Sequence, residues 1–113
     1  GLASSLNEIC QSSGSSIRLF EDHLPVTEGV RGACEIMGFD PLYVANEGKI
    51  LVILPEEHSK EVLDIMRRHE AGRESTIIGR VSGDKRKLLT METSIGSTRI
   101  IDMISGEQLP RIC

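Results

Sequence analysis

Apolar residues near the start of the chain recur at the spacing of an α-helix. One face of this predicted helix is apolar and carries Leu2, Leu6, Ile9 and Cys10. We predict that the helix runs from Gly1 to Gly14, because glycine commonly ends a helix in the left-handed conformation. On the apolar face, Cys10 is expected to be a small buried hydrophobic residue.

A second helix is predicted for Glu28–Met37 from its end signals. Thr27 is placed to cap its N-terminus, and Gly38 follows its last residue. Its predicted inner face carries Val30, Cys34 and Met37. Cys34 is therefore also expected to lie in the core.

A third helix is predicted to begin at Pro55 and to run to about His69. Its first residues include Glu56 and Glu57, and its last turn is basic. This charge order complements the helix dipole. We interpret the charged positions as a solvated helix face.

Five shorter segments have the composition of β-strands, and turn residues separate the last three. They are Ile17–Phe20, Ile50–Leu54, Thr76–Val81, Lys87–Glu92 and Thr98–Met103. The continuous apolar run at Ile50–Leu54 is typical of a buried strand. The order of elements predicts an α/β (α+β) fold with a mixed sheet covered by helices on one face. We expect one domain, residues 1–103, and a mobile tail, residues 104–113.

Composition and charge exclude several classes of function. The net charge is −4 and only three residues are aromatic, so the basic patch and stacking residues of nucleic-acid binders are missing. No apolar run approaches the roughly 20 residues of a membrane span, and no basic leader precedes an apolar stretch. Cys10, Cys34 and Cys113 form no CxxC pair, which favours a reducing, cytoplasmic location.

The three histidines, His23, His58 and His69, are widely separated in the sequence and are expected at the surface or at helix ends. No metal site is predicted, because no Cys/His cluster has zinc-ligand spacing. The chain begins with Gly1 rather than methionine. We therefore expect it to be part of a longer protein.

The terminal sequence Pro110-Arg111-Ile112-Cys113 is the first candidate for chemistry. Cys113 lies beyond every predicted element, so its thiol has no evident packing role. The ten residues 104–113 would span at most about 33–36 Å, which suits a swinging acceptor for an acyl-type group. Arg111 would favour the thiolate and the terminal carboxylate would oppose it. The alternative is that the cysteine is incidental.

The second candidate is the segment Asn46-Glu47-Gly48-Lys49, in a loop that leads to the predicted strand at Ile50. Its carboxylate, amide and ammonium groups could supply a base, an orienting group and a phosphate contact. The alternative is a tight turn with Gly48 at positive φ and solvated charges. The chain contains no GxxxxGK[ST], GxGxxG or GxSxG motif, so it shows no nucleotide-binding loop or serine nucleophile of its own.

Four segments together resemble the C-terminal domain of the HypE family, the carbamoyl dehydratases of hydrogenase maturation. These segments are residues 1–9, 30–35, 40–49 and 105–113. The terminal Pro-Arg-Ile-Cys is the most specific of them. This family is similar in fold to the aminoimidazole-ribonucleotide synthetase superfamily, whose N-terminal domain binds ATP and dimerises. The resemblance implies that the present chain is the second domain, so alone it should be inactive.

The resemblance also implies a reaction. HypF would load a carbamoyl group onto Cys113, and ATP with magnesium, bound mainly outside this chain, would phosphorylate the carbamoyl oxygen. Loss of a proton and of phosphate would leave a thiocyanate, and its cyano group would pass to iron on the HypC–HypD complex for nickel–iron hydrogenase. Glu47 is then the expected base, with Asn46 or Lys49 orienting the substrate.

Two other interpretations remain open. The chain can be a non-catalytic interaction domain in which the terminal cysteine is incidental. A related enzyme, such as a selenophosphate synthetase, is a weaker option, since we see no reason for it to need a thiol at its last residue. Partners implied by the HypE resemblance are HypF, HypC–HypD and a second copy in a homodimer, with no nucleic acid and no membrane.

Overall fold

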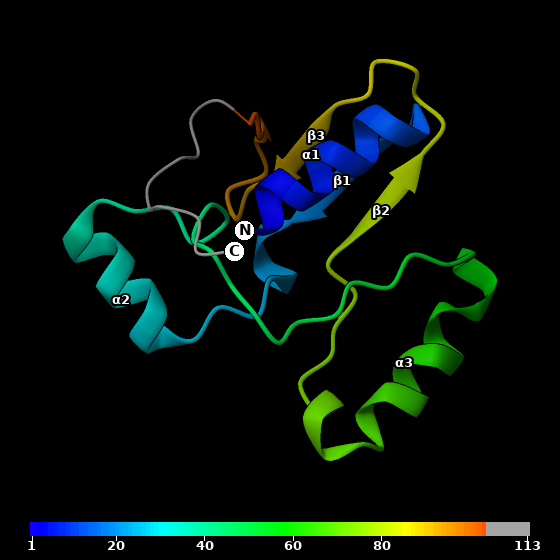
Figure 1. The fold of residues 1–113 in the computed structure, drawn as a ribbon, viewed down its shortest axis with the longest axis horizontal. Helices are drawn as coiled ribbons and strands as arrows, with labels where there is room; N and C mark the ends of the chain where they lie inside the picture. Colours follow the sequence, from blue (N-terminus) through cyan, green and yellow to red (C-terminus); the bar gives the residue numbers. More distant parts are fainter. Residues whose placement is uncertain (104–113) are drawn as a thin grey trace.

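A four-stranded sheet with one helix lying along it forms the centre of the computed structural model, which describes residues 1–103 (Figure 1). The helices are α1 (Leu2–Ser13), α2 (Glu28–Met37) and α3 (Ser59–Arg67), with short 3-10 turns η1 (Glu21–His23), η2 (Glu56–His58) and η3 (Glu70–Gly72). The strands are β1 (Ser16–Phe20), β2 (Gly79–Ser82), β3 (Leu89–Glu92) and β4 (Thr98–Ile100). The strand order is β2-β1-β3-β4.

The sheet is mixed, which confirms the predicted fold class. β1 pairs in parallel with β3 and antiparallel with β2, while β3 and β4 are antiparallel. The parallel pairing requires a long crossover, and the chain between β1 and β3 contains α2, α3 and β2. The three predicted strands after residue 75 are all present, each shorter than expected.

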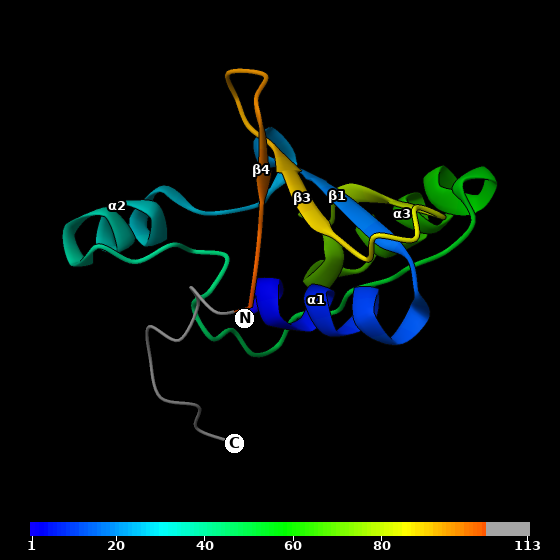
Figure 2. The same cartoon turned by 90° about the horizontal axis from the view of Figure 1, so that it is seen from above.

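The core lies between α1 and one face of the sheet, as Figure 2 shows from above. Side chains alternate along β1, so Ile17 and Leu19 point inward and stand opposite Leu89 and Met91 of β3. The buried cluster comprises Ala3, Leu6, Cys10, Ile17, Leu19, Leu42, Leu89, Met91 and Ile101. Leu2 and Ile9 pack against it while only partly buried, so the buried stripe of α1 is shifted slightly from the predicted face.

The ends of α1 and α2 follow the predicted end signals. Gly14 has φ 71° and its N–H donates to the carbonyl of Cys10, while Gly38 ends α2 with φ 72°. The Thr27 hydroxyl accepts a hydrogen bond from the N–H of Val30 at 3.4 Å. Cys10 is fully buried as predicted, and this burial raises the pKa of its thiol.

The predicted inner face of α2 is only partly confirmed. Cys34 is buried, but Val30 and Met37 are 48% and 56% exposed. The reason is the position of the helix, because Figures 1 and 2 both show α2 standing beside the sheet rather than on it. No sheet face therefore covers its apolar stripe.

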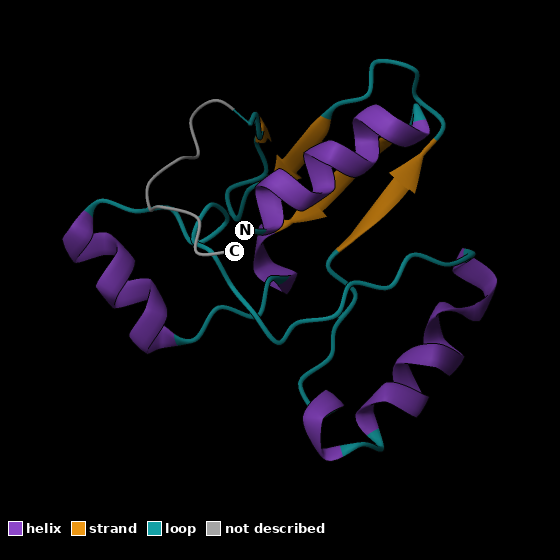
Figure 3. Cartoon of the chain, viewed as in Figure 1, coloured by secondary structure: helices purple, strands orange, loops and turns teal. Residues whose placement is uncertain are grey.

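The buried strand predicted at Ile50–Leu54 is wrong. Figure 3 shows the whole connection between α2 and η2 as loop, and Ile50 is 80% exposed. Both edges of β1 are occupied by β2 and β3, and within residues 1–103 no strand pairs with this segment. Among the described residues, the outer edges of β2 and β4 pair with no further strand, and residues 50–54 pair with neither edge. An apolar run alone is therefore not sufficient for a strand.

The third predicted helix is divided into η2 and α3, and α3 ends at Arg67, two residues before the predicted end. His23, His58 and His69 are exposed, as expected. Among the described residues, no group of three or more His, Cys, Asp or Glu side chains is arranged to hold a metal ion. No helix in this part of the chain has both the length and the apolar character of a membrane span.

Candidate functional site

The loop that follows α2 is the part of the described chain that carries polar candidates for chemistry. Its first half is fixed by hydrogen bonds. Asp40 Oδ1 accepts from the N–H of Leu42 at 3.0 Å, and the Asp40 carbonyl accepts from the N–H of Tyr43 at 3.0 Å. Asp40 Oδ2 also forms an ion pair of 2.8 Å with Arg99 Nη2 of β4. The loop is therefore folded on itself and tied to the edge of the sheet.

The start of α1 holds the same loop from the other side. The N–H of Ala3 donates to the Leu42 carbonyl at 2.9 Å, which satisfies one of the free N–H groups of the first helical turn. The Leu42 side chain is buried in the core. Gly1 lies so close that a Cβ there would be 2.7 Å from the carbonyl oxygen of Val44. Only glycine permits this approach of helix and loop.

Two side chains bind the chain where it leaves β4. The Tyr43 hydroxyl donates to the carbonyl of Asp102 at 2.8 Å, and Asn7 Nδ2 donates to the carbonyl of Ile101 at 3.0 Å. Asn7 is buried and also donates to the Ala3 carbonyl at 2.9 Å. The loop after α2 and the last described residues are therefore joined directly.

The second half of the loop carries the predicted site residues. Asn46, Glu47 and Lys49 all have exposed side chains. Gly48 has φ 73°, as the turn alternative requires. An exposed turn does not exclude chemistry, because loops on a fixed framework are where proteins commonly place binding and catalytic groups. The assignment of Glu47 as a base stays a prediction.

The tail residues Pro110, Arg111, Ile112 and Cys113 lie outside the described residues. The other two cysteines are free thiols. Cys10 of α1 is buried in the core, and Cys34 of α2 is also buried. Neither Cys10 nor Cys34 therefore presents an accessible sulfur. The segment leading to Cys113 begins directly after the residues that Asn7 and Tyr43 hold.

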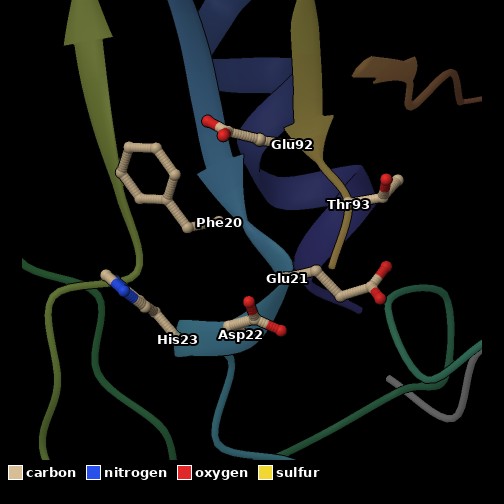
Figure 4. Close-up of a pocket in the computed structure, with 6 residues that line it drawn as sticks. All are labelled: Phe20, Glu21, Asp22, His23, Glu92 and Thr93. Carbon is tan, nitrogen blue, oxygen red and sulfur yellow. The ribbon is translucent and has the colours of Figure 1, made fainter. Parts of the chain in front are cut away.

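A separate pocket lies at the end of β1, where the chain turns into η1 (Figure 4). It is lined by Phe20, Glu21, Asp22, His23, Glu92 and Thr93. The Ser94 hydroxyl is 2.7 Å from Glu21 Oε1 and 2.8 Å from Asp22 Oδ1, so the carboxylates are held by the adjoining turn. None of the predicted site residues lines this pocket.

Sequence reasoning missed Tyr43, Arg99 and Asn7 as residues that shape the loop. A signal was present for two of them, Tyr43 and Asn7. Tyr43 is the only tyrosine of the chain. Asn7 is a polar residue one position after Leu6 on an otherwise apolar stripe, which is a sign of a buried hydrogen bond.

Comparison with known proteins extends these observations. The profile of the AIR synthase related protein family, C-terminal domain, matches residues 1–92. A carbamoyl dehydratase HypE of Azotobacter vinelandii is 51% identical over all 113 residues, which span 33% of that protein. The chain therefore covers about a third of the length of this curated relative.

Two solved structures share the fold. One is a HypE–HypF complex, with a TM-score of 0.84 and 44% identity over 90% of this chain and 33% of that one. The other is the hydrogenase maturation protein HypE in complex with ATP, with a TM-score of 0.89 and 41% identity over 100% of this chain and 35% of that one. The chain belongs to the AIR synthase related family, as its C-terminal domain, and over its whole length it is similar to HypE carbamoyl dehydratases.

Proposed function

We propose that this chain is the thiol-carrying domain of an ATP-dependent carbamoyl dehydratase that acts in nickel–iron hydrogenase maturation. The observation that carries the proposal is the match to a carbamoyl dehydratase over all 113 residues, which extends through Cys113. The domain is one part of the enzyme. We therefore expect the isolated chain to neither hydrolyse ATP nor form thiocyanate.

The first step loads the sulfur. The Cys113 thiolate attacks the carbamoyl carbon of an activated donor, the donor's leaving group departs, and a thiocarbamate S–C bond remains. The donor enzyme is HypF, which is supported by the similarity to a HypE solved in complex with HypF. An accessible cysteine is needed, and the two described cysteines are buried.

The second step removes the elements of water from the thiocarbamate. Bound ATP supplies the phosphoryl group that turns the carbamoyl oxygen into a leaving group. One N–H proton of the carbamoyl group is lost as its oxygen is phosphorylated. Glu47 accepts the second N–H proton as the C–O bond breaks and phosphate departs, which leaves S–C≡N on Cys113. The balance is thiocarbamate plus ATP giving thiocyanate, ADP, phosphate and a proton. Asn46 or Lys49 orients the carbamoyl group.

The similarity to a HypE solved with ATP supports a nucleotide in the longer protein. The described residues contain no glycine-rich phosphate loop, so we place ATP and its magnesium mainly outside this chain. We infer a homodimer in the cytoplasm, without nucleic acid or membrane contacts. Cyanide then passes to iron on HypC–HypD. Breaking the S–C bond to a thiolate and an iron-bound cyanide takes up two electrons, which we assign to the reduced acceptor complex.

The test uses the longer protein that contains this domain, incubated with HypF, carbamoyl phosphate and ATP. Mass spectrometry of the tail peptide should show one carbamoyl group at Cys113, followed by loss of one water. Cys113→Ala removes the acceptor sulfur, so both changes should vanish, whereas Cys34→Ala should leave both unchanged. An unmodified Cys113 in the wild type would favour the alternative of a non-catalytic interaction domain.

The same assay tests Glu47. Glu47→Gln keeps the size of the side chain and removes the basic carboxylate. Carbamoylation should persist, while loss of water should slow by about 10²–10⁴-fold, the usual contribution of a positioned general base. Glu57→Gln is a matched control, because Glu57 is also an exposed glutamate and lies outside the loop. An unchanged rate of water loss in Glu47→Gln would leave Glu47 as a turn residue only.

A further inference from the structure

The N-terminus of α1 is capped by the loop after α2 rather than by a side chain. Gly1 occupies the N-cap position, and no side chain makes a capping hydrogen bond there. The carbonyl of Leu42 accepts from the N–H of Ala3 at 2.9 Å instead. A carbonyl suits this place, because the first N–H groups of a helix have no partner within the helix and carry partial positive charge. The loop is therefore attached to α1 through main-chain atoms.

The absence of a side chain at Gly1 makes this contact possible. A Cβ at Gly1 would lie 2.7 Å from the carbonyl oxygen of Val44 and 2.9 Å from that of Leu42. It would also lie 2.9 Å from the carbonyl carbon of Tyr43. All three are main-chain atoms, so no side chain can rotate to make room. A larger residue must displace either the backbone of residues 42–44 or the first turn of α1.

The first turn of α1 is the more firmly held of these two sides. Ala3 is fully buried, and its carbonyl accepts from the buried side chain of Asn7 at 2.9 Å. The loop beyond Val44 is different, because residues 45–49 are all exposed. A Cβ at Gly1 therefore shifts the loop at Val44, and Glu47 follows three residues later.

We propose that Gly1 is a positioning residue for the dehydration step, because its missing side chain lets the loop lie against α1 and so determines where Glu47 stands. The inference rests on the proposed function, in which Glu47 is the base. A base must lie within hydrogen-bond reach of the proton that it removes. A misplacement of about 1 Å, even when its cause is far from the reacting atoms, can cost about 10²-fold in rate. Gly1 acts through the loop alone.

The experiment follows water loss in the longer protein after Cys113 has been fully carbamoylated, so that the loading rate does not enter. Gly1→Ala introduces the Cβ. Gly32→Ala is the first control, because a Cβ at this position of α2 meets nothing within 4 Å. Gly72→Ala is the second, because its Cβ would lie 2.1 Å from the carbonyl oxygen of Met66, in η3 rather than at the loop. The two controls measure the loss of a glycine and a main-chain clash elsewhere.

Gly1→Ala should lower the maximal rate of water loss per folded protein by about 10- to 100-fold, without changing the ATP concentration that gives half of that rate. Both controls should keep the wild-type rate. The double variant Gly1→Ala/Glu47→Gln should be no slower than Glu47→Gln alone, because residues that act through one another have non-additive effects. Additive losses, or a wild-type rate in Gly1→Ala, would overturn the inference.

A second measurement reports on the loop without catalysis. In the 113-residue chain, the backbone amide NMR signals of residues 44–49 should shift in Gly1→Ala and stay in place in Gly32→Ala. Unshifted signals in Gly1→Ala would overturn the inference whatever the activity. Absence of water loss in the wild type, with these shifts present, would instead overturn the proposed function and leave the placement of the loop by Gly1 standing.

Discussion

The α1–sheet unit, made of α1 and the four strands, and the outer segment, residues 28–67, bury their apolar residues very differently. Leu19, Leu89 and Met91 of the first region are almost fully buried. In the outer segment, Ile36 is 88% and Ile50 80% exposed. Both regions are rich in aliphatic residues, so composition does not explain the difference. The sheet offers a face to α1, and neither α2 nor α3 lies on that sheet (Figure 1).

The residues that stabilise the fold and the candidate residues for chemistry lie in different regions. Burial of aliphatic side chains is the largest favourable contribution to folding, and within residues 1–103 it is concentrated in the α1–sheet unit. The candidate residues Asn46, Glu47 and Lys49 lie in the outer segment and are exposed. Contacts of residues 40–43 with α1 and β4 connect the two regions. The side chains of residues 46–49 can therefore change without loss of the core, while residues 40–43 keep the loop attached to α1 and β4.

Substitution of matched aliphatic residues should separate the two regions most strongly. In the 113-residue chain, Leu19→Ala should lower the free energy of unfolding by about 2–5 kcal/mol, because it leaves a cavity in the core. Ile50→Ala should change it by less than about 0.5 kcal/mol, as expected for an exposed position. Urea unfolding followed by circular dichroism measures both. A similar loss in the two variants would contradict the division into a stabilising unit and an outer segment.

A matched pair of asparagines tests the same division with polar groups. Asn7→Ala removes two buried hydrogen bonds, to the carbonyls of Ala3 and Ile101, and should cost about 1–3 kcal/mol of unfolding free energy. Asn46→Ala removes an exposed side chain and should leave the free energy of unfolding within about 0.5 kcal/mol. Equal effects in urea unfolding would show that the loop contributes to stability after all.

The ends of α1 and α2 could be predicted because their signals are local. Gly14 and Gly38 end helices through their own backbone freedom, and Thr27 caps through a residue three positions away. The alternating apolar residues of β1 need another element to cover them, and α1 covers them. The prediction of a strand at Ile50–Leu54 failed because a strand also needs a partner, and hydrophobicity in the sequence does not show whether a sheet edge pairs with it.

The candidate site likewise contains one feature that the sequence predicts and others that it does not. The turn at Gly48 was predictable from Asn-x-Gly spacing, and its φ of 73° agrees. The hydrogen bonds of Tyr43 and Asn7 were not predictable, because they join residues 59 and 94 positions apart. Such contacts arise only once the sheet has brought the end of β4 beside α1. Residues that perform chemistry can be proposed from their type, whereas residues that place them require the fold.

The smallest expected effect concerns the ion pair of Asp84 and Arg86 in the turn between β2 and β3. The side-chain hydrogen bond from Arg86, followed by that from its backbone N–H, lowers the pKa of the Asp84 carboxyl to about 2 from an ordinary 3.8. A carboxyl whose pKa is lowered by folding stabilises the fold at pH values above its ordinary pKa. This stabilisation is lost as the pH falls from about 4 to about 2.

The pair is exposed to solvent, so its contribution to stability should be slight compared with that of Leu19 or Asn7. NMR titration of the Asp84 carboxyl should give a midpoint near its lowered pKa of about 2. Arg86→Gln should raise this midpoint toward 3.8 without reaching it, because the backbone N–H of residue 86 still donates. Arg80→Gln, at another exposed ion pair, should leave the midpoint unchanged. A large loss of stability in Arg86→Gln would mean that surface charge, and not the α1–sheet core, holds this region together.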